Sequence, residues 1–361
     1  PAVDMENMMR EKNIPLFALE SREPITNFDV IAFTLQYELS YTNILNMLDL
    51  ANVPILRTER KLDDPFILVG GPCAYNVEPM ADFVDIVVLG EGEEVNLEIL
   101  NAYKEWNKNK TTREDFLYQI SSIEGVYIPS FYDVTYNEDN TVKEVVPNRE
   151  NIPSKPHKRI IKDVENVPYP EKLIVPFIDT VHNRVVLELF RGCTRGCRFC
   201  QAGMIYRPIR EKSVERLKEI VDKLVKSTGY DEISLSSLST SDYSKLSELT
   251  DYLVDEYASN NIGISLPSLR LDNFSMEIAE KIQQVRKSGL TFAPEAGTQR
   301  LRDVINKGVS EEDLQNATKK AFEMGWNSVK LYFMIGLPTE TYDDLDGIAK
   351  LAYDVIDMYR E

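Results

Sequence analysis

The stretch VVLELFRGCTRGCRFC, residues Val185–Cys200, decides how this chain is interpreted. An apolar, strand-like run leads into a loop with three cysteines in the spacing C-x3-C-x2-C: Cys193, Cys197 and Cys200. Thiolates packed this closely repel one another unless a cation holds them, and the common solutions are a metal ion or an iron–sulfur cluster. Three thiolates leave one iron of a four-iron cluster open to an outside ligand, and an open metal position is where chemistry happens.

Zinc is the competing ligand for these cysteines. A structural zinc site needs a fourth ligand, usually Cys or His. The chain has only two histidines, His157 and His182, and His182 lies before the strand, at the opposite end from the loop. Since no second C-x2-C pair exists, the sequence favours an iron–sulfur cluster over zinc.

Composition sets the context of the loop. The 361 residues carry 41 Lys plus Arg against 59 Asp plus Glu, a formal net charge of -18, which argues against broad nonspecific nucleic-acid binding. Of the four cysteines only Cys73 lies outside the loop, so a disulfide framework is not indicated and a reducing cytoplasm is expected. No apolar run approaches the roughly 20 residues that cross a bilayer, so we expect no membrane association.

The surroundings of the loop are basic. Between residues 184 and 212 there are seven cations and two glutamates, in a chain that is acidic overall. Nearby cations stabilise an anionic cluster and tune its potential. A phosphate-bearing substrate and a solvated basic surface are the alternative interpretations.

The first part of the chain alternates short apolar runs with helical patterns, which predicts a doubly wound parallel sheet. The predicted strands are 28–33, 66–69 and 84–89, and the predicted helices are 41–51 and 93–106. Glycines follow two of the strands: Gly70, Gly71, Gly90 and Gly92. They allow a ligand to approach the carboxyl edge of the sheet, although tight turns alone would explain them equally well.

The rest divides into a connector and a second body. Residues 116–180 combine a β-hairpin, predicted from the runs 126–129 and 132–136, with a Pro-rich linker, which separates a first domain, 1–115, from a second, 181–361. The second body repeats strand and helix, the pattern of a full or partial (βα) barrel whose site lies at the carboxyl ends of the strands. Its further predicted strands are 232–235, 263–266, 290–293 and 329–334, and its predicted helices are 214–228, 243–260, 276–287 and 311–324.

The cysteine loop resembles that of the radical S-adenosylmethionine (SAM) enzymes, in which three cysteines hold a 4Fe-4S cluster and the fourth iron binds SAM. The resemblance implies reductive cleavage of SAM to a 5′-deoxyadenosyl radical, and an electron donor of flavodoxin or ferredoxin type. Phe199 matches the aromatic position near the adenine. Glu295 and Arg300, in the fourth-strand motif, and Gly336, in the fifth, match positions that line the cofactor. Ser236 and Ser237 stand where many relatives have a Gly-Gly-Glu motif.

The first domain resembles the cobalamin-binding domains of an uncharacterised branch of B12-domain radical proteins, which makes cobalamin a candidate cofactor. Its D-x-H-x-x-G motif is absent, and neither histidine fits that role by position. Cys73 alone cannot build the second cluster of a methylthiotransferase. Compared with that branch, the sequence is expected to lack the first strand of domain 1 and the chain beyond the fifth barrel strand.

Two hypotheses follow. The first is a radical SAM enzyme whose substrate and catalytic residues are unknown, with methyl transfer if cobalamin binds. The second is a nucleic-acid or ribonucleoprotein-binding module in which the cluster is structural, with RNA or another phosphate-bearing molecule as partner.

Overall fold

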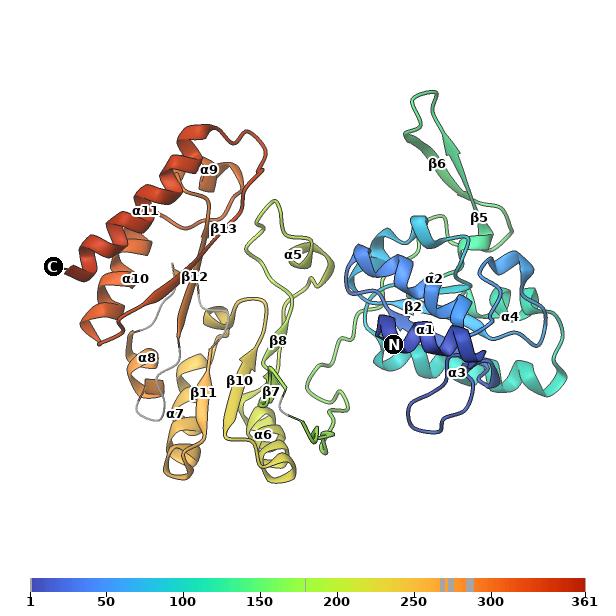
Figure 1. Ribbon diagram of the computed structural model, residues 1–361, viewed down its shortest axis with the longest axis horizontal. Coiled ribbons are helices and arrows are strands. Elements are labelled where there is room, and N and C mark those ends of the chain that lie inside the picture. Colours follow the sequence, from blue (N-terminus) through green and yellow to red (C-terminus); the bar gives the residue numbers. More distant parts are fainter. Residues whose placement is uncertain (1, 179, 267–269, 272–275, 284–288, 361) are drawn as a thin grey trace. The chain divides into compact units, whose positions relative to one another are not determined.

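The computed structural model describes residues 2–178, 180–266, 270–271, 276–283 and 289–360 (Figure 1). The contacts divide the chain into two units, Pro1–Ile161 and Lys162–Glu361, which are described separately below. The division falls inside the range predicted as a connector. The reason is that the first part of that range, from Phe116 to Tyr132, contributes to the core of unit 1.

The centre of unit 1 is a four-stranded sheet in the order β1-β2-β3-β4. Its strands are β1 (Val30–Thr34), β2 (Phe66–Gly70), β3 (Ile86–Val88) and β4 (Val126–Tyr127). The first three are parallel and coincide with the predicted apolar runs, whereas β4 lies antiparallel to β3. The sheet therefore has one antiparallel edge strand, supplied by the connector range. The sequence predicted residues 126–129 as part of a hairpin, but not that they pair with β3.

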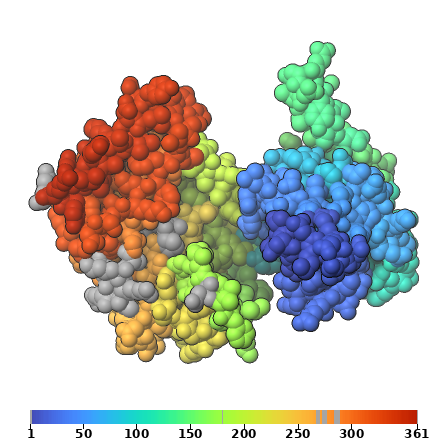
Figure 2. All heavy atoms as spheres, viewed as in Figure 1, coloured from blue at the N-terminus to red at the C-terminus, as the bar shows by residue number. Residues whose placement is uncertain are grey.

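Helices pack around this sheet, and a hairpin projects from it. The helices are α1 (Val3–Lys12), α2 (Tyr41–Leu50), α3 (Gly92–Asn109) and α4 (Arg113–Ile120). The predicted hairpin forms between β5 (Tyr132–Tyr136) and β6 (Val142–Pro147), which are antiparallel. Figure 1 and Figure 2 show it standing away from the rest of unit 1.

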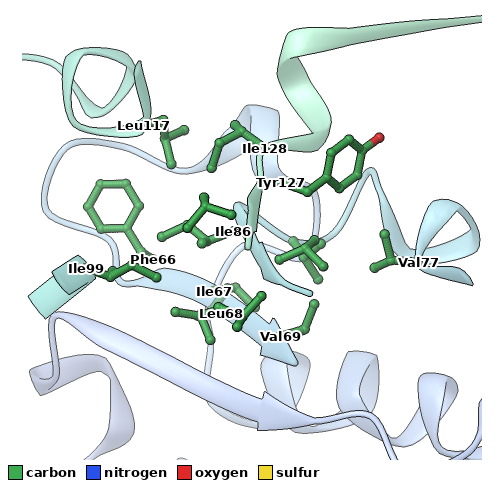
Figure 3. Close-up of a cluster of buried hydrophobic side chains, with 14 of the residues drawn as sticks. Phe66, Ile67, Leu68, Val69, Val77, Ile86, Ile99, Leu117, Tyr127 and Ile128 are labelled. Carbon is green, nitrogen blue, oxygen red and sulfur yellow. The ribbon is translucent and has the colours of Figure 1, made fainter. Parts of the chain in front are cut away.

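The core of unit 1 is built on β2, whose residues Phe66 to Val69 are all buried (Figure 3). Successive side chains on a strand point to opposite faces, so both faces of β2 are covered. The Phe66 ring lies 4.8 Å from the Phe116 ring of α4 and 5.8 Å from the Trp106 ring of α3, measured between centroids. Each fully buried side chain of this size contributes about 1.5–3 kcal/mol to folding, so this cluster fixes α3 and α4 on one face of the sheet.

Unit 2 contains two parallel sheets and a short antiparallel pair. One sheet has the order β11-β10-β7 and the other pairs β12 with β13, all in parallel. The strands are β7 (Val185–Glu188), β8 (Phe190–Arg191), β9 (Arg210–Glu211), β10 (Glu232–Ser236), β11 (Gly263–Ser265), β12 (Leu290–Glu295) and β13 (Val329–Phe333). The five parallel strands follow the predicted serial (βα) pattern of a partial barrel.

Helices follow most of these strands. They are α5 (Ala202–Ile205), α6 (Val214–Thr228), α7 (Leu246–Tyr257), α8 (Met276–Gln283), α9 (Gln299–Val304), α10 (Glu311–Glu323) and α11 (Tyr342–Arg360). The helix predicted over 276–287 forms as α8, and residues 284–287 lie outside the described part of the chain. Across the described ranges, no helix has the length and apolar content that crossing a membrane would require.

Helix α6 shows how the sequence specifies these elements. Ser213 caps it by accepting a hydrogen bond from the backbone N–H of Arg216, and Gly229 ends it in the left-handed conformation. Its buried residues Val214, Leu217, Val221 and Leu224 recur every three or four positions and pack in the core of the β7-β10-β11 sheet. The observed span is the one predicted from this spacing.

Candidate cofactor site

The cysteine loop begins at a position, Gly192, that only glycine can occupy. Gly192, directly after β8, has φ +94, and a Cβ there would lie 2.6 Å from the carbonyl oxygen of Pro208. Arg207 donates from Nε to the carbonyl of Cys193 at 3.2 Å. The segment that returns through β9 therefore holds the start of the loop in place.

An ion pair ties the loop to the carboxyl end of β10. Arg195 forms two hydrogen bonds with the carboxylate of Asp242, one of them from Nε to Oδ2 at 2.8 Å. Ser239 also donates to Asp242, at 2.7 Å. Burial by itself would raise the pKa of Asp242, but the hydrogen bonds from Arg195 and Ser239 outweigh burial and hold that pKa below its ordinary value.

Hydrogen bonds to backbone carbonyls tie the other side of the loop to the end of α9 and the chain that follows it. The N–H of Arg198 donates to the carbonyl of Ile305 at 2.9 Å, and Nδ2 of Asn306 donates to the carbonyl of Gly196 at 2.9 Å. Arg198 also donates from its guanidinium to the carbonyl of Val304. Figure 1 shows α5 and α9 toward the same end of the strands. The loop is thus held between the chain after β10 and the chain after α9.

The fourth-strand residue Glu295 is linked to the cysteine loop by Lys307, which contacts both. Its Oε1 accepts a hydrogen bond from Nζ of Lys307 at 2.9 Å, and both side chains are largely buried, with exposed fractions of 17% and 11%. The same Nζ lies 5.9 Å from the centroid of the Phe199 ring. Glu295 has φ +68 at a bulge in the β12–β13 pairing, a conformation that L residues rarely adopt. The predicted residues Glu295 and Phe199 are therefore joined through Lys307.

Much of the positive charge near the loop is paired. Lys212 donates to Oε2 of Glu188 at 2.6 Å, and Arg191 donates to Oε1 of the same carboxylate at 3.0 Å. Burial by itself would raise the pKa of Glu188, but these hydrogen bonds outweigh burial and hold that pKa below its ordinary value. Arg184 pairs with Glu232. The count of cations in the sequence therefore overstates the net charge that the folded loop presents.

The other predicted cofactor residues lie at or after strand ends, and each forms a hydrogen bond or an ion pair with a neighbouring residue of unit 2. The hydroxyl of Ser237 lies 3.0 Å from that of Thr240, and the carbonyl of Ser236 accepts from the N–H of Leu189. Arg300 pairs with Asp344, at the start of α11. Gly336 has φ +87, and its N–H donates to Oε2 of Glu340 at 2.7 Å, so the Glu340 side chain holds the fifth-strand turn.

The three loop cysteines are free thiols and are partly exposed. The Sγ of Cys200 accepts a hydrogen bond from the N–H of Gly203 at 3.4 Å, and such donors stabilise a thiolate. Over the described residues, no three Cys, His, Asp or Glu side chains converge to hold a metal ion, so Cys193, Cys197 and Cys200 share one loop without a ligating arrangement. As a donor set, three soft thiolates fit an iron–sulfur cluster better than a hard cation.

In unit 1 the four predicted glycines line a single cavity of about 370 Å³. The cavity runs along β1 to the carboxyl ends of β1, β2 and β3, and Asn96 and Ile99 of α3 also line it. Two glycines also have a steric role. A Cβ at Gly90 would lie 2.1 Å from the carbonyl oxygen of Arg159, and one at Gly71 would lie 3.0 Å from that of Leu35. All four glycines therefore line the cavity, and Gly71 and Gly90 also allow neighbouring backbone to pack closely against them.

Sequence reasoning missed Asp242 and Lys307, which connect the loop to the strand ends. Asp242 lies six residues after β10, and Lys307 lies twelve residues after Glu295. A single charged residue at such a distance carries no periodic signal, because its partner is set by the path of the loop. Their proximity to predicted strand ends was the available indication.

Comparison with known proteins gives two family matches. The family described as "Radical SAM proteins, N-terminal" matches residues 1–129, and the family described as "Radical SAM superfamily" matches residues 187–352. The two matches cover the sheet of unit 1 and the cysteine loop with the strands of unit 2.

Individual relatives extend over most of the chain. An uncharacterised protein of Methanocaldococcus jannaschii is 33% identical over 350 residues, 96% of this chain and 67% of the relative. An uncharacterised methyltransferase of Pyrococcus horikoshii is 24% identical over 301 residues, 80% of this chain and 58% of the relative. The chain thus spans about three fifths to two thirds of these relatives.

A solved structure shares the fold. It is a radical SAM methyltransferase from Kitasatospora setae with cobalamin and a 4Fe-4S cluster bound; it superposes with a TM-score of 0.61 at 12% identity. The match covers 98% of this chain and 65% of that one. At this identity the likeness concerns the fold.

Proposed function

The chain belongs to the radical SAM superfamily of enzymes, and on that premise we propose that its cysteine loop holds a 4Fe-4S cluster at which SAM is cleaved reductively. The single observation that carries the proposal is the position of the loop. It is fastened by Arg195 to Asp242 after β10, and by Arg198 and Asn306 to the chain after α9. Asp242 lies in the segment that follows β10, and the chain after α9 belongs to the segment that follows β12; the second-strand and fourth-strand motifs were predicted at the ends of these two strands.

The residues in and around the loop have different proposed roles. When bound, the cluster would supply the electron that breaks the sulfonium bond of SAM. Cys193, Cys197 and Cys200 would hold it, and Phe199, with 38% of its surface exposed, offers an aromatic face for the adenine. Lys307 and Glu295 place a paired charge beside that ring. The Glu340 side chain fixes the N–H of Gly336, which orients the fifth-strand backbone.

Anaerobic reconstitution with iron and sulfide tests the proposal. Reduced protein incubated with SAM should form 5′-deoxyadenosine and methionine, and Cys197→Ala should abolish both the broad visible absorbance of the cluster and this product. Cys73→Ala is the matched control, because Cys73 is buried in the core of unit 1, outside the loop. An intact cluster that yields no 5′-deoxyadenosine would contradict the enzyme proposal and favour the binding module with a structural cluster.

We further infer that unit 1 binds a corrinoid at the glycine-lined cavity. The support is the fold shared with a cobalamin-containing structure and the placement of Gly70, Gly71, Gly90 and Gly92 around one cavity. A volume of about 370 Å³ is enough for part of such a ligand, so the remainder would lie outside the cavity mouth. Methyl transfer is the reaction that a bound corrinoid would make natural.

Gly70 allows a clean test of the corrinoid site. A Cβ there would make ordinary van der Waals contact with Val88, 3.6 Å from its carbonyl oxygen, so the position accepts a side chain and we expect Gly70→Leu to fill part of the cavity. Corrinoid that co-purifies with the original chain, measured by its spectrum and by cobalt content, should be lost in Gly70→Leu while 5′-deoxyadenosine formation persists. Absence of corrinoid from both proteins after expression with cobalamin would refute this inference and leave the SAM proposal standing.

Two expectations accompany the proposal. The reaction requires a low-potential electron donor, for which a flavodoxin- or ferredoxin-like partner is the natural class. A cytoplasmic location is favoured because all four cysteines are free thiols, as they would be in a reducing compartment.

A further inference from the structure

A second cavity in unit 1 lies near the amino ends of the strands, whereas the glycines lie at their carboxyl ends. Its volume is about 310 Å³, and it adjoins Asp85, directly before β3, and Arg113, at the start of α4. The charged residues that line it are Arg57, Arg60, Asp85, Arg113, Glu114 and Arg149. Four guanidinium groups and two carboxylates thus share one cavity, in a chain whose net charge is -18.

The inner wall of this cavity is a buried Arg–Asp–Arg cluster. Asp85 Oδ2 accepts from Arg60 at 2.9 Å and lies 3.2 Å from Arg113, and it also accepts the N–H of Ile67 at 2.8 Å. The side chain of Arg60 is fully buried and that of Arg113 is 12% exposed. Both also donate to backbone carbonyls, Arg60 to Phe83 at 2.6 Å and Arg113 to Pro65 at 3.3 Å. These two arginines are therefore fixed in position.

One carboxylate does not neutralise two guanidinium groups. Burial lowers the pKa of Arg60, Asp85 raises it again, and the charge of Arg113 lowers it further. Asp64 offsets part of this repulsion from outside the lining of the cavity. Among the lining residues of the inner wall, two guanidinium groups face one carboxylate in a poorly hydrated place, where their charge acts strongly on anything that enters the cavity.

The outer part of the cavity carries two more arginines with donors to spare. Arg57 donates from Nε to the carbonyl of Ala81 at 3.1 Å, and within the described ranges no carboxylate pairs with it. Arg149 lies over the ring of Phe131 at 4.9 Å and pairs with Glu114 at 2.6 Å, where both side chains are about half exposed. Exposed pairs of this kind exchange partners at little cost.

We propose that this arginine cavity binds the phosphate group of a small phosphate monoester, gripped by Arg57 and Arg149 in front of the fixed Arg60–Asp85–Arg113 wall. Guanidinium forks match phosphate oxygens two at a time, and a dianion would supply the negative charge that the cavity lacks. The volume exceeds that of a phosphate group, which leaves room for the first atoms of an ester substituent. This inference is independent of the proposed function.

A small ligand fits better than a nucleic acid. A strongly acidic chain repels a polyanion over its whole length, whereas a single phosphate group experiences chiefly the local field of the cavity. Glu114 at the mouth would further oppose a row of phosphates.

Isothermal titration of the full chain at low ionic strength tests the site, with glycerol 3-phosphate and inorganic phosphate as separate probes. We expect glycerol 3-phosphate to bind with a dissociation constant of about 1 mM or tighter. Arg57→Gln with Arg149→Gln should weaken binding by roughly tenfold or more, while Glu114→Gln should strengthen it by about twofold to fivefold. Lys108→Gln with Lys12→Gln is the charge-matched control, because both lysines are exposed cations, paired with their neighbours Glu105 and Glu11, and neither lines the cavity.

The opposite signs expected for the arginine and glutamate variants separate a site from a general loss of charge. Thermal unfolding checks that each variant is folded, and the side chains of Arg149 and Glu114 are exposed enough to leave the core intact. Equal binding by the original chain and the double arginine variant would overturn the proposal, as would no heat with either probe. Tighter binding of a short RNA, lost in the double variant, would overturn the small-molecule assignment.

Discussion

Units 1 and 2 each place a candidate ligand site at the carboxyl ends of parallel strands, but they secure it by different means. In unit 1 the cavity is shaped by glycines, and backbone fits against backbone: Gly90 lies against Arg159 and Gly71 against Leu35. In unit 2 Gly192 also lies against the backbone of Pro208, but most of the contacts that hold the cysteine loop are made by charged and polar side chains, with Arg195 on Asp242 and Asn306 on Gly196. The first site therefore tolerates little change in shape, whereas the second depends on charge.

The largest expected effect comes from Gly90→Ala. The new methyl group would lie 2.1 Å from the carbonyl of Arg159, at a backbone φ of +102, so we expect a loss of about 3 kcal/mol or more in the stability of unit 1. Gly336→Ala is the control, since its φ of +87 is also unfavourable but its Cβ meets nothing within 4 Å; about 1–2 kcal/mol is expected in unit 2.

The two tryptophans make this comparison measurable. Trp106 lies in the core of unit 1 and Trp326 in that of unit 2, so a Trp→Phe change at either one leaves a fluorescence probe of the other unit. Urea unfolding followed by Trp106 should show the Gly90→Ala loss. Equal losses for the two glycine variants would break the distinction between the sites.

Lys307→Met should produce the next largest effect, in unit 2. It leaves the carboxylate of Glu295 largely buried without its partner, which should cost about 2 kcal/mol in urea unfolding followed by Trp326. Adding Glu295→Gln should recover part of the loss, because the unpaired charge is then removed. A double variant whose loss equals the sum of the single losses would show that the pair contributes no coupling.

The pH dependence of unit 2 should show a smaller effect. The pKa of Asp242 is lower in the folded state, so the folded chain binds fewer protons there than the unfolded chain does. This stabilisation is present above about pH 4 and is lost as the pH falls through the folded-state pKa. The unfolding midpoint should therefore drop less steeply between about pH 5 and pH 3 in Asp242→Asn. The control is Asp231→Asn, at an exposed residue before β10; parallel profiles for all three proteins would contradict the account.

The smallest effect is expected for Arg159→Gln. Arg159 pairs with Glu94 and Glu98, each at 2.6 Å, but both glutamates are about half exposed, so the loss should stay below about 1 kcal/mol. Its backbone hydrogen bonds to Leu89 and Glu91 remain in the variant. Trp106 fluorescence in urea would show a larger loss if the ion pairs, rather than the backbone contact, held the segment to Gly90.

The sequence predicted the repeating elements well because periodicity records burial. The run 66–69 became β2, and the spacing of Val214, Leu217 and Leu224 placed α6. The sequence predicted residues 126–129 as part of a β-hairpin, and β4 forms there. Its pairing with β3 was not predicted, because the partner of so short a strand depends on tertiary contacts.

The candidate site could be predicted from the sequence where a residue type has few structural or chemical roles. Three cysteines in eight positions indicate cluster chemistry by themselves. Glycines have many uses. Only the structure separates Gly70, where a Cβ would make ordinary van der Waals contact with Val88, from Gly90, where it would clash with Arg159. Arg300 shows the limit of a motif, since its guanidinium pairs with Asp344, 44 residues away, and that partner is decided by how α9 and α11 meet.

The most direct test of the central claim is Mössbauer spectroscopy of the reconstituted, iron-57-labelled chain before and after addition of SAM. The account predicts four irons per chain, three of them unchanged and one shifted when SAM binds, because only three cysteines are available as ligands in the loop. A protein that holds stoichiometric zinc instead of iron, or four irons that all keep their signals when SAM is added, would contradict it.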